Sequence, residues 1–135
     1  MSRESKMVAG GGLVDRRSPH TVDETVGRLT ELLREKGITL FALVDHSGEA
    51  ARVGLVMRPT KLLIFGNPRA GTPLMQDAPR SAIDLPLKIL VWQDGDGTTR
   101  ITTNGAEYLR ERHGLGPEAA AVLGAADALA AAASV

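Results

Sequence analysis

The sequence of 135 residues predicts a single α+β domain, in which helices pack on one face of a mainly antiparallel sheet. Three observations predict this class. Apolar residues recur at helical spacing after Thr21. Apolar runs of strand length occupy 38–44, 61–65 and 86–93. The segment 94–97, Asp-Gly-Asp-Gly, predicts a tight hairpin, because glycine accepts the positive φ of such turns, and a hairpin makes its two strands antiparallel.

The amino-acid composition indicates which kinds of partner and which cellular location are expected for the protein. Hydrophobic residues make up 43% and charged residues 24%, as in globular domains. Sixteen basic residues balance sixteen acidic ones, and the chain has only one Trp, one Tyr and two Phe, so no nucleic-acid partner is expected. Cysteine is absent, which excludes disulfides and thiolate metal sites. The apolar end 119–135 is mostly alanine, contains Asp127 and falls short of the roughly 20 residues of a membrane span. The expectation is a cytoplasmic protein without a membrane partner.

The chain divides into three parts. Residues 1–12 carry scattered charges and a triple glycine, so they predict a flexible N-terminal tail. Residues 13–116 form the α+β domain, which opens on an edge strand at 13–18. Residues 117–135 form an alanine-rich C-terminal helix.

The first helix has clear signals at both ends. Thr21 is an N-cap residue, and Glu24 completes a capping box three residues later. Gly37 is the left-handed terminator. One face of this helix is apolar, through Val22, Val26, Leu29 and Leu33.

The next segments alternate between strands and short helices. The run 38–44 is apolar on both faces, which predicts a central position in the sheet. The strand 61–65 stops at Gly66-Asn67-Pro68. Thr72-Pro73 has the pattern of an N-cap followed by a proline at the first helical position, so a short helix is expected to begin there. After the hairpin, Asn104 and Glu107 predict a second capping box.

The segment 66–72 superficially matches a phosphate-binding loop, but Thr72 stands where that loop needs lysine. A weaker hypothesis remains. Free amides of a helix that begins near Thr72 would attract a small anionic ligand, with Asn67, Arg69 and Gly71 close by. The alternative is that Thr72 only caps its own helix and that residues 66–68 only form a turn.

Two further residues are candidates for ligand binding or acid–base chemistry. His46 lies between Asp45 and Glu49, whose carboxylates would be near the imidazole. Asp84 is flanked by apolar residues, so its carboxylate is expected to be partly buried and to need a partner, either Arg80, Lys88 or a backbone amide. For both residues a purely structural role is the alternative. No catalytic residue, metal ligand or cofactor is assigned, because no nucleophile motif or metal-ligand spacing is present.

The strings Leu62–Met75 (LLIFGNPRAGTPLM) and Ile83–Lys88 (IDLPLK) resemble the bacterial and archaeal domain of unknown function family 302. The resemblance extends over residues 13–116, with the C-terminal helix outside it. It implies a curved antiparallel sheet that grips its helices, in the TATA-binding-protein-like class, and a dimeric protein. It brings no settled activity, substrate or cofactor. Thr103-Asn104-Gly105-Ala106 keeps only the asparagine of a turn that is common in the family.

The functional expectation is a small-ligand-binding or protein-interaction module that acts as a homodimer and holds its ligand near the turn 66–75. The alternative is a small-molecule enzyme that uses Asp84 and His46 as acid–base groups.

Overall fold

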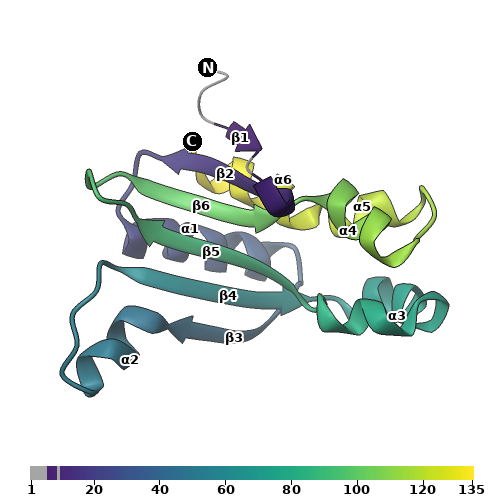
Figure 1. Ribbon diagram of the computed structural model, residues 1–135, viewed down its shortest axis with the longest axis horizontal. Coiled ribbons are helices and arrows are strands. Elements are labelled where there is room, and N and C mark those ends of the chain that lie inside the picture. The colour runs from purple at the N-terminus through teal and green to yellow at the C-terminus, as the bar shows by residue number, and fades with distance from the viewer. Residues whose placement is uncertain (1–5, 9) are drawn as a thin grey trace.

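The computed structural model describes residues 6–8 and 10–135, and its strands form one antiparallel sheet of six in the order β1-β2-β6-β5-β4-β3 (Figure 1). The strands are β1 (Lys6–Val8), β2 (Leu13–Ser18), β3 (Thr39–Asp45), β4 (Thr60–Gly66), β5 (Leu87–Gln93) and β6 (Thr99–Asn104). The α-helices are α1 (Val22–Glu35), α2 (His46–Arg52), α3 (Pro68–Asp77), α4 (Ala106–His113), α5 (Ala119–Leu123) and α6 (Ala125–Ala133). Two 3-10 helices, η2 (Gly10–Gly12) and η3 (Pro79–Ile83), complete the described elements.

The helices α1 and α6 cover one face of the sheet. In Figure 1 both lie behind the strands, while α3, α4 and α5 lie beyond one end of the sheet and α2 lies at the other end. The contacts agree, because α1 touches β3, β4 and β5, whereas α6 touches β2, β5 and β6. The predicted α+β class, with an antiparallel sheet and helices on one face, is confirmed.

Local sequence signals explain α1. Thr21 Oγ1 accepts a hydrogen bond from the Glu24 amide at 3.0 Å, and Glu24 Oε1 accepts one from the Thr21 amide at 2.9 Å, so the predicted capping box is confirmed. The pKa of the Glu24 carboxyl lies below its usual range because the Thr21 amide bonds the charged form. Gly37 has φ of 67°, which confirms the predicted left-handed helix end.

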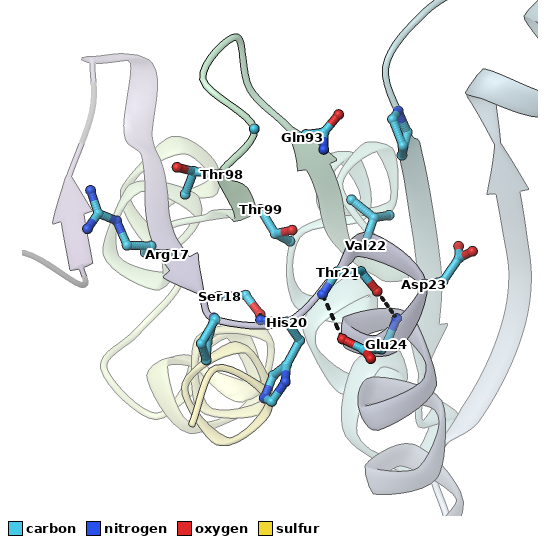
Figure 2. Close-up of a pocket in the computed structure, with 13 residues that line it drawn as sticks. Arg17, Ser18, His20, Thr21, Val22, Asp23, Glu24, Gln93, Thr98 and Thr99 are labelled. Atoms are coloured by element: carbon cyan, nitrogen blue, oxygen red, sulfur yellow. Dashed lines mark hydrogen bonds between the residues drawn. The ribbon is translucent and has the colours of Figure 1, made fainter.

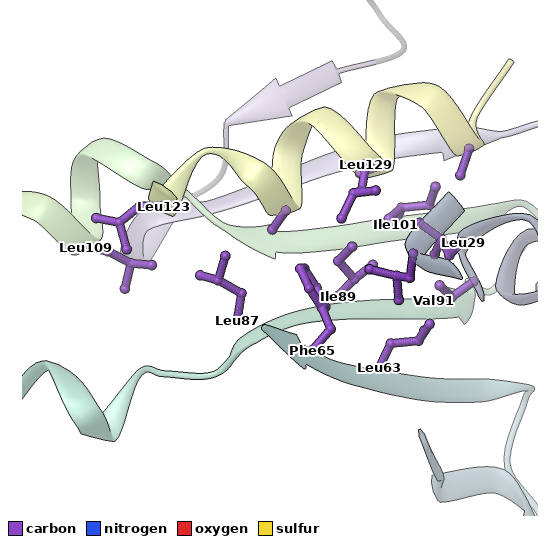
Figure 3. Close-up of a cluster of buried hydrophobic side chains, with 14 of the residues drawn as sticks. Leu29, Leu63, Phe65, Leu87, Ile89, Val91, Ile101, Leu109, Leu123 and Leu129 are labelled. Carbon is purple, nitrogen blue, oxygen red and sulfur yellow. The ribbon is translucent and has the colours of Figure 1, made fainter. Parts of the chain in front are cut away.

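The core lies between α1, α6 and the covered face of the sheet (Figure 3). Alternate residues of β4 and β5 point into it, as the twofold side-chain period of a strand requires. Leu29 of α1, Leu63 and Ile89 are completely buried there. Other labelled members in Figure 3 are Phe65, Leu87, Val91, Ile101, Leu109, Leu123 and Leu129.

The C-terminal helix is anchored by polar contacts as well as by the core. Asp127 of α6 accepts hydrogen bonds from Arg16 at 3.2–3.3 Å and from Lys6 at 3.1 Å. Arg28 of α1 donates to the carbonyl oxygens of Ala133 and Val135. The alanine-rich segment is therefore part of the domain's core, and it forms two helices, α5 and α6, that meet at Gly124.

The opposite face of the sheet is open. The strand register places Val44, Leu62 and Leu90 side by side on this face. Trp92 lies on the same face, and its Nε1 donates to Thr102 Oγ1 across the sheet at 2.8 Å. In Figure 1 none of the described α-helices crosses in front of β4 or β5.

Four local predictions are corrected by the structure. The strand 38–44, expected at the centre, is β3 at one edge of the sheet, and 13–18, expected at the edge, is β2 between β1 and β6. The outer strand β1 belongs to the segment predicted as a tail, of which residues 1–5 and 9 lie outside the described residues. Gly105 rather than Asn104 is the N-cap of α4, and it makes no side-chain cap bond.

The hairpin 94–97 joins β5 to β6 as predicted. Asp94 organises it, since its carboxylate accepts hydrogen bonds from the amides of Asp96 and Thr98 and from Arg100 Nε at 2.7 Å. Hydrogen bonding to Asp96 and to Arg100 holds the pKa of Asp94 well below its usual range.

We predict that Thr21→Ala lowers the free energy of unfolding by about 1 kcal/mol, because the Glu24 amide loses its side-chain acceptor. Urea denaturation measures this loss. Thr30→Ala in the same helix is the control, because Thr30 donates only to the Val26 carbonyl and alanine is the better helix former. Equal losses in the two variants would contradict the capping role.

We also predict a pH-dependent effect of Asp94→Asn. The folded-state pKa of Asp94 is depressed, so its contribution to stability is complete above the unfolded pKa of about 4 and is lost as the pH falls through the lower folded value. The gap between the unfolding midpoints of wild type and variant should therefore be widest at neutral pH and close in acid. A gap that stays constant with pH would contradict this account.

Candidate functional site

A cavity of about 480 Å³ lies at the end of the sheet, between the C-terminal end of β4, helix α3 and helix α5. Its lining is mainly apolar, and the polar side chains in it are Asn67 and Thr72. Such a cavity is typical of small-molecule sites, where an apolar wall holds the body of a ligand and a few polar groups orient it. The apolar lining comprises Ile38, Phe41, Phe65, Pro68, Ala70, Met75, Leu85, Pro86, Leu87, Ala121, Val122 and Ala125.

The end of β4 forms the floor of the cavity because Gly66 has no side chain. A Cβ atom at Gly66 would approach Phe41 Cε2 and Pro86 Cβ to 3.4 Å, the short end of ordinary van der Waals contact. Phe41 and Pro86 therefore pack against the bare backbone of the strand end. Gly71 is different, because a Cβ atom there would meet nothing nearer than Met75 Cε at 4.0 Å, so this position adds open space to the cavity.

Helix α3 begins earlier than predicted, and this removes the expected anion site. Asn67 is the N-cap, with Pro68 in the first turn, so Thr72-Pro73 lies inside the helix. Asn67 Oδ1 accepts from the Arg69 amide at 3.0 Å, and the Asn67 carbonyl accepts from the amides of Ala70 and Gly71 at 3.0 and 2.9 Å. The amides at the start of this helix are thus already paired, and none is left to hold an anion.

The structure separates the candidate residues of this turn. Asn67, Gly71 and Thr72 line the cavity, whereas Arg69 is exposed and does not. Without the Arg69 cation and the helix amides, the cavity favours a mainly apolar ligand over an anionic one.

Asp84 lies close to the cavity and finds partners that the sequence did not indicate. Its carboxylate is 2.6 Å from His113 Nε2 and 3.1 Å from Arg112 Nη1, both at the end of α4. The side chains of His113 and Asp84 are only 7% and 16% exposed. The predicted partners Arg80 and Lys88 make no such bond, since the Lys88 ammonium donates to the Pro86 carbonyl. These contacts tie α4 to the segment Leu85–Leu87, which forms part of the cavity wall.

The proposed acid–base pair is wrong, because His46 and Asp84 lie at opposite ends of the sheet. His46 follows Asp45, which pairs with Lys61, while Asp84 precedes Leu87, which pairs with Phe65 at the other end of β4. The carboxylates near His46 have other partners. Asp45 caps α2 through Gly48 and Ser47, whose hydrogen bonds lower its pKa, and Glu49 pairs with Arg52.

A second, more polar cleft of about 630 Å³ opens where β2 leads into α1 (Figure 2). Thr21, Glu24, His20 and Asp23 are among its lining residues. Thr21 and Glu24 are bonded to each other, His20 Nε2 to the Val135 oxygen, and Asp23 to Lys61 at 2.9 Å. These four side chains already have partners within the protein, so the apolar cavity is the better candidate site.

Within 6–8 and 10–135, no three His, Asp or Glu side chains come together as a possible metal site. Over the same stretches, none of the helices has the length and apolar character needed to cross a membrane.

The sequence did not indicate the far wall of the cavity. Ala121, Val122 and Ala125 come from the C-terminal helices, and Phe41 comes from β3. The run of small alanine side chains was the available signal, because a helix with small side chains leaves space where it meets a neighbour. No sequence signal near residues 66–75 indicated that the C-terminal helices α5 and α6 would pack beside this turn.

The fold matches a solved structure. The crystal structure of an uncharacterised conserved DUF302 protein from Bacillus stearothermophilus superimposes with a TM-score of 0.74 and 21% sequence identity, over 93% of this chain and 97% of that one. At this identity the likeness concerns the fold. The model of the family described as domain of unknown function DUF302 matches residues 14–133. The chain belongs to this family, as its sequence motifs indicated, and the match includes the C-terminal helices that the resemblance had left outside.

Longer relatives share much of the sequence. Fluoride-specific ion channel FluC 1 of Brucella suis biovar 1 (strain 1330) is 42% identical over 109 residues, which are 81% of this chain and 43% of that protein. FluC 2 of Brucella melitensis biotype 1 matches at the same identity over 40% of its length. This chain thus spans less than half the length of the curated relatives that it matches.

We predict that Asp84→Asn lowers the free energy of unfolding by about 1–3 kcal/mol, because the nearly buried His113 loses a charged hydrogen-bond partner. Chemical denaturation measures the loss. Asp77→Asn, at the exposed end of α3, is the matched control and should change stability by less than about 0.5 kcal/mol. If both variants were as stable as wild type, the contacts of Asp84 would not stabilise the fold.

Proposed function

We propose that this chain is a cytoplasmic small-ligand-binding module that acts as a homodimer, and that its ligand occupies the apolar cavity beside α3. The observation that carries the proposal is the cavity itself, about 480 Å³ with an almost wholly apolar lining at the end of a sheet. A ligand gains free energy there by removing apolar surface from water.

The lining supports a particular kind of ligand. Its body would be apolar and would contact Phe65, Met75 and Leu87. Asn67 and Thr72 supply the polar contacts at the rim. Because Asn67 Oδ1 already accepts from the Arg69 amide, the side-chain NH₂ of Asn67 is the group that can donate. A neutral ligand with a hydrogen-bond acceptor near one end fits this arrangement.

The relatives are consistent with a module that occurs within longer proteins. The matched 109 residues occupy 40–43% of the Brucella FluC proteins, so a unit of this kind occurs beside other sequence in those proteins. Their fluoride-channel name describes the whole proteins, and the apolar lining of the cavity supports no anion at this site.

A neutral apolar dye tests the proposal. We expect N-phenyl-1-naphthylamine to bind the purified protein saturably, with increased fluorescence. Ala121→Phe places a ring at the α5 wall of the cavity, where it takes space that the ligand would occupy, and should weaken binding about 10-fold or more, which corresponds to about 1.4 kcal/mol. Ala120→Phe is the matched control, since Ala120 is an exposed neighbour in the same helix and does not line the cavity.

Two results would overturn the proposal: no saturable binding by the wild type, or equal weakening by Ala121→Phe and Ala120→Phe. Native mass spectrometry of the protein purified from its own host gives an independent readout. A retained small molecule that Ala121→Phe loses would support the cavity as the site.

A further inference from the structure

Strand β3 has the sequence of a buried strand and the position of an edge strand. Its residues Leu40-Phe41-Ala42-Leu43-Val44 are apolar on both faces, a pattern typical of strands with neighbours on both sides. In the sheet order, however, β3 pairs with β4 and with no other described strand. Phe41 is 52% exposed and Leu43 is 45% exposed. In the monomer, these two apolar side chains of β3 are therefore exposed, although the pattern of the strand is typical of one with a neighbour on each side.

The other edge of the sheet shows how an edge is normally protected. Strand β1 has three residues and carries the exposed Lys6, which pairs with Asp127. Natural proteins protect edges with short strands and charges of this kind. Strand β3 has seven residues, and its only charged residue is Asp45 at the end. A bulge at Phe41 interrupts the register, but Ala42–Asp45 is regular.

The free edge also carries unpaired backbone groups. In an antiparallel ladder, alternate residues turn their N–H and C=O groups away from the neighbouring strand. For β3 those groups face outward along the whole regular stretch, since no described strand lies beyond it. A further strand would satisfy these groups and would cover Phe41 and Leu43 at the same time.

Apolar exposure continues around this edge. Ala42 and Val44 belong to the open face of the sheet, next to Ile64 and Leu62. The loop after α2, which leads from the end of β3 back to β4, exposes Val56 almost completely, at 98%. A surface that combines an edge strand with adjoining apolar residues is typical of a protein interface.

We propose that β3 pairs antiparallel with β3 of a second copy, across a twofold axis at Leu43, so that two six-stranded sheets join into one continuous sheet. This inference rests on the proposed homodimer and assigns its interface. A second copy is the occupant because antiparallel pairing of identical strands is symmetric and closes as a dimer.

The side chains support self-pairing at this register. Leu43 lies opposite the partner's Leu43, and Ala42 lies opposite the partner's Val44 on the open face. Asp45 lies opposite the partner's Phe41, so no two like charges face each other. The pairs at Leu43 and between Ala42 and Val44 lie in the regular stretch, whereas the pair of Asp45 with Phe41 lies at the bulge, outside these central contacts. Because Phe41 also lines the cavity, the partner lies beside the proposed ligand site.

Charge substitutions at Leu43 test this interface. We expect the wild type to be a dimer in sedimentation equilibrium. Leu43→Lys places two like charges against each other at the axis and should raise the dimer dissociation constant about 30-fold or more, as for a residue at the centre of an interface. Leu13→Lys is the matched control, since Leu13 is a strand residue of similar exposure, 41%, far from β3. It should leave the dimer unchanged.

Mixing makes the test specific to self-pairing. Leu43→Glu alone should also be monomeric, but an equimolar mixture of Leu43→Lys and Leu43→Glu should form a heterodimer, because opposite charges then meet at the axis. A variant that was merely misfolded would not recover on mixing. Circular dichroism of each variant checks that it is folded.

The chain contains no cysteine, so crosslinking reports the geometry directly. Under mild oxidation Leu43→Cys should form a covalent dimer much faster than Leu13→Cys, because residues directly opposite in an antiparallel pair bring their Cβ atoms to about 5 Å.

Three results would overturn the inference: a monomeric wild type, a dimer that Leu43→Lys does not weaken, or failure of the two charge variants to pair on mixing. Failure of the ligand proposal is distinguishable, because Leu43 does not line the cavity. Monomeric Leu43→Lys should still bind N-phenyl-1-naphthylamine, and Ala121→Phe should still be a dimer.

Discussion

Burial of only one face of the sheet is the constraint on which the rest of this structure depends. Side chains alternate along a strand, so the register that sets Leu63 beside Ile89 under α1 and α6 also sets Leu62 beside Leu90 on the open face. A slip of one residue in β4 would expose Leu63 and Phe65 and would put Leu62 and Ile64 in the core. Since Leu63 and Ile89 are completely buried, such a slip is strongly disfavoured.

The same layering creates the cavity. The large side chains of α1 fill the centre of the covered face, whereas its end is covered by α3 and by the small residues of α5 and α6. Asp84 joins the segment before β5 to the end of α4 through His113 and Arg112, so one wall of the cavity is held by a polar cluster in which Asp84 and His113 are nearly buried. A cavity with a fixed wall suits a ligand better than a mobile groove, because less ordering is needed on binding.

Several features were predictable because their signals are local. The capping box of α1, the end at Gly37 and the hairpin around Asp94 depend on residues within a few positions of each other, and all three are present. The start of α3 was not predictable in this way. Asn67-Pro68 and Thr72-Pro73 each have the pattern of an N-cap residue followed by a proline in the first turn. In the structure α3 begins at the first of these two pairs. Pro73 is then accepted within the helix, although it has no N–H to donate to the Arg69 carbonyl four residues earlier.

The amino-acid sequence by itself determined the class of fold, the capping box of α1, the family and the turn 66–75 that forms one wall of the candidate site. Tertiary structure alone decided that this turn meets the C-terminal helices, that Asp84 meets His113 rather than His46, and that β3 lies at an edge. The physical reason is that capping and alternation act over a few residues, whereas strand order and helix docking depend on contacts between distant segments. The apolar residues of β3 indicate a strand that is covered on both sides, but they do not indicate whether the same chain or a second copy covers it.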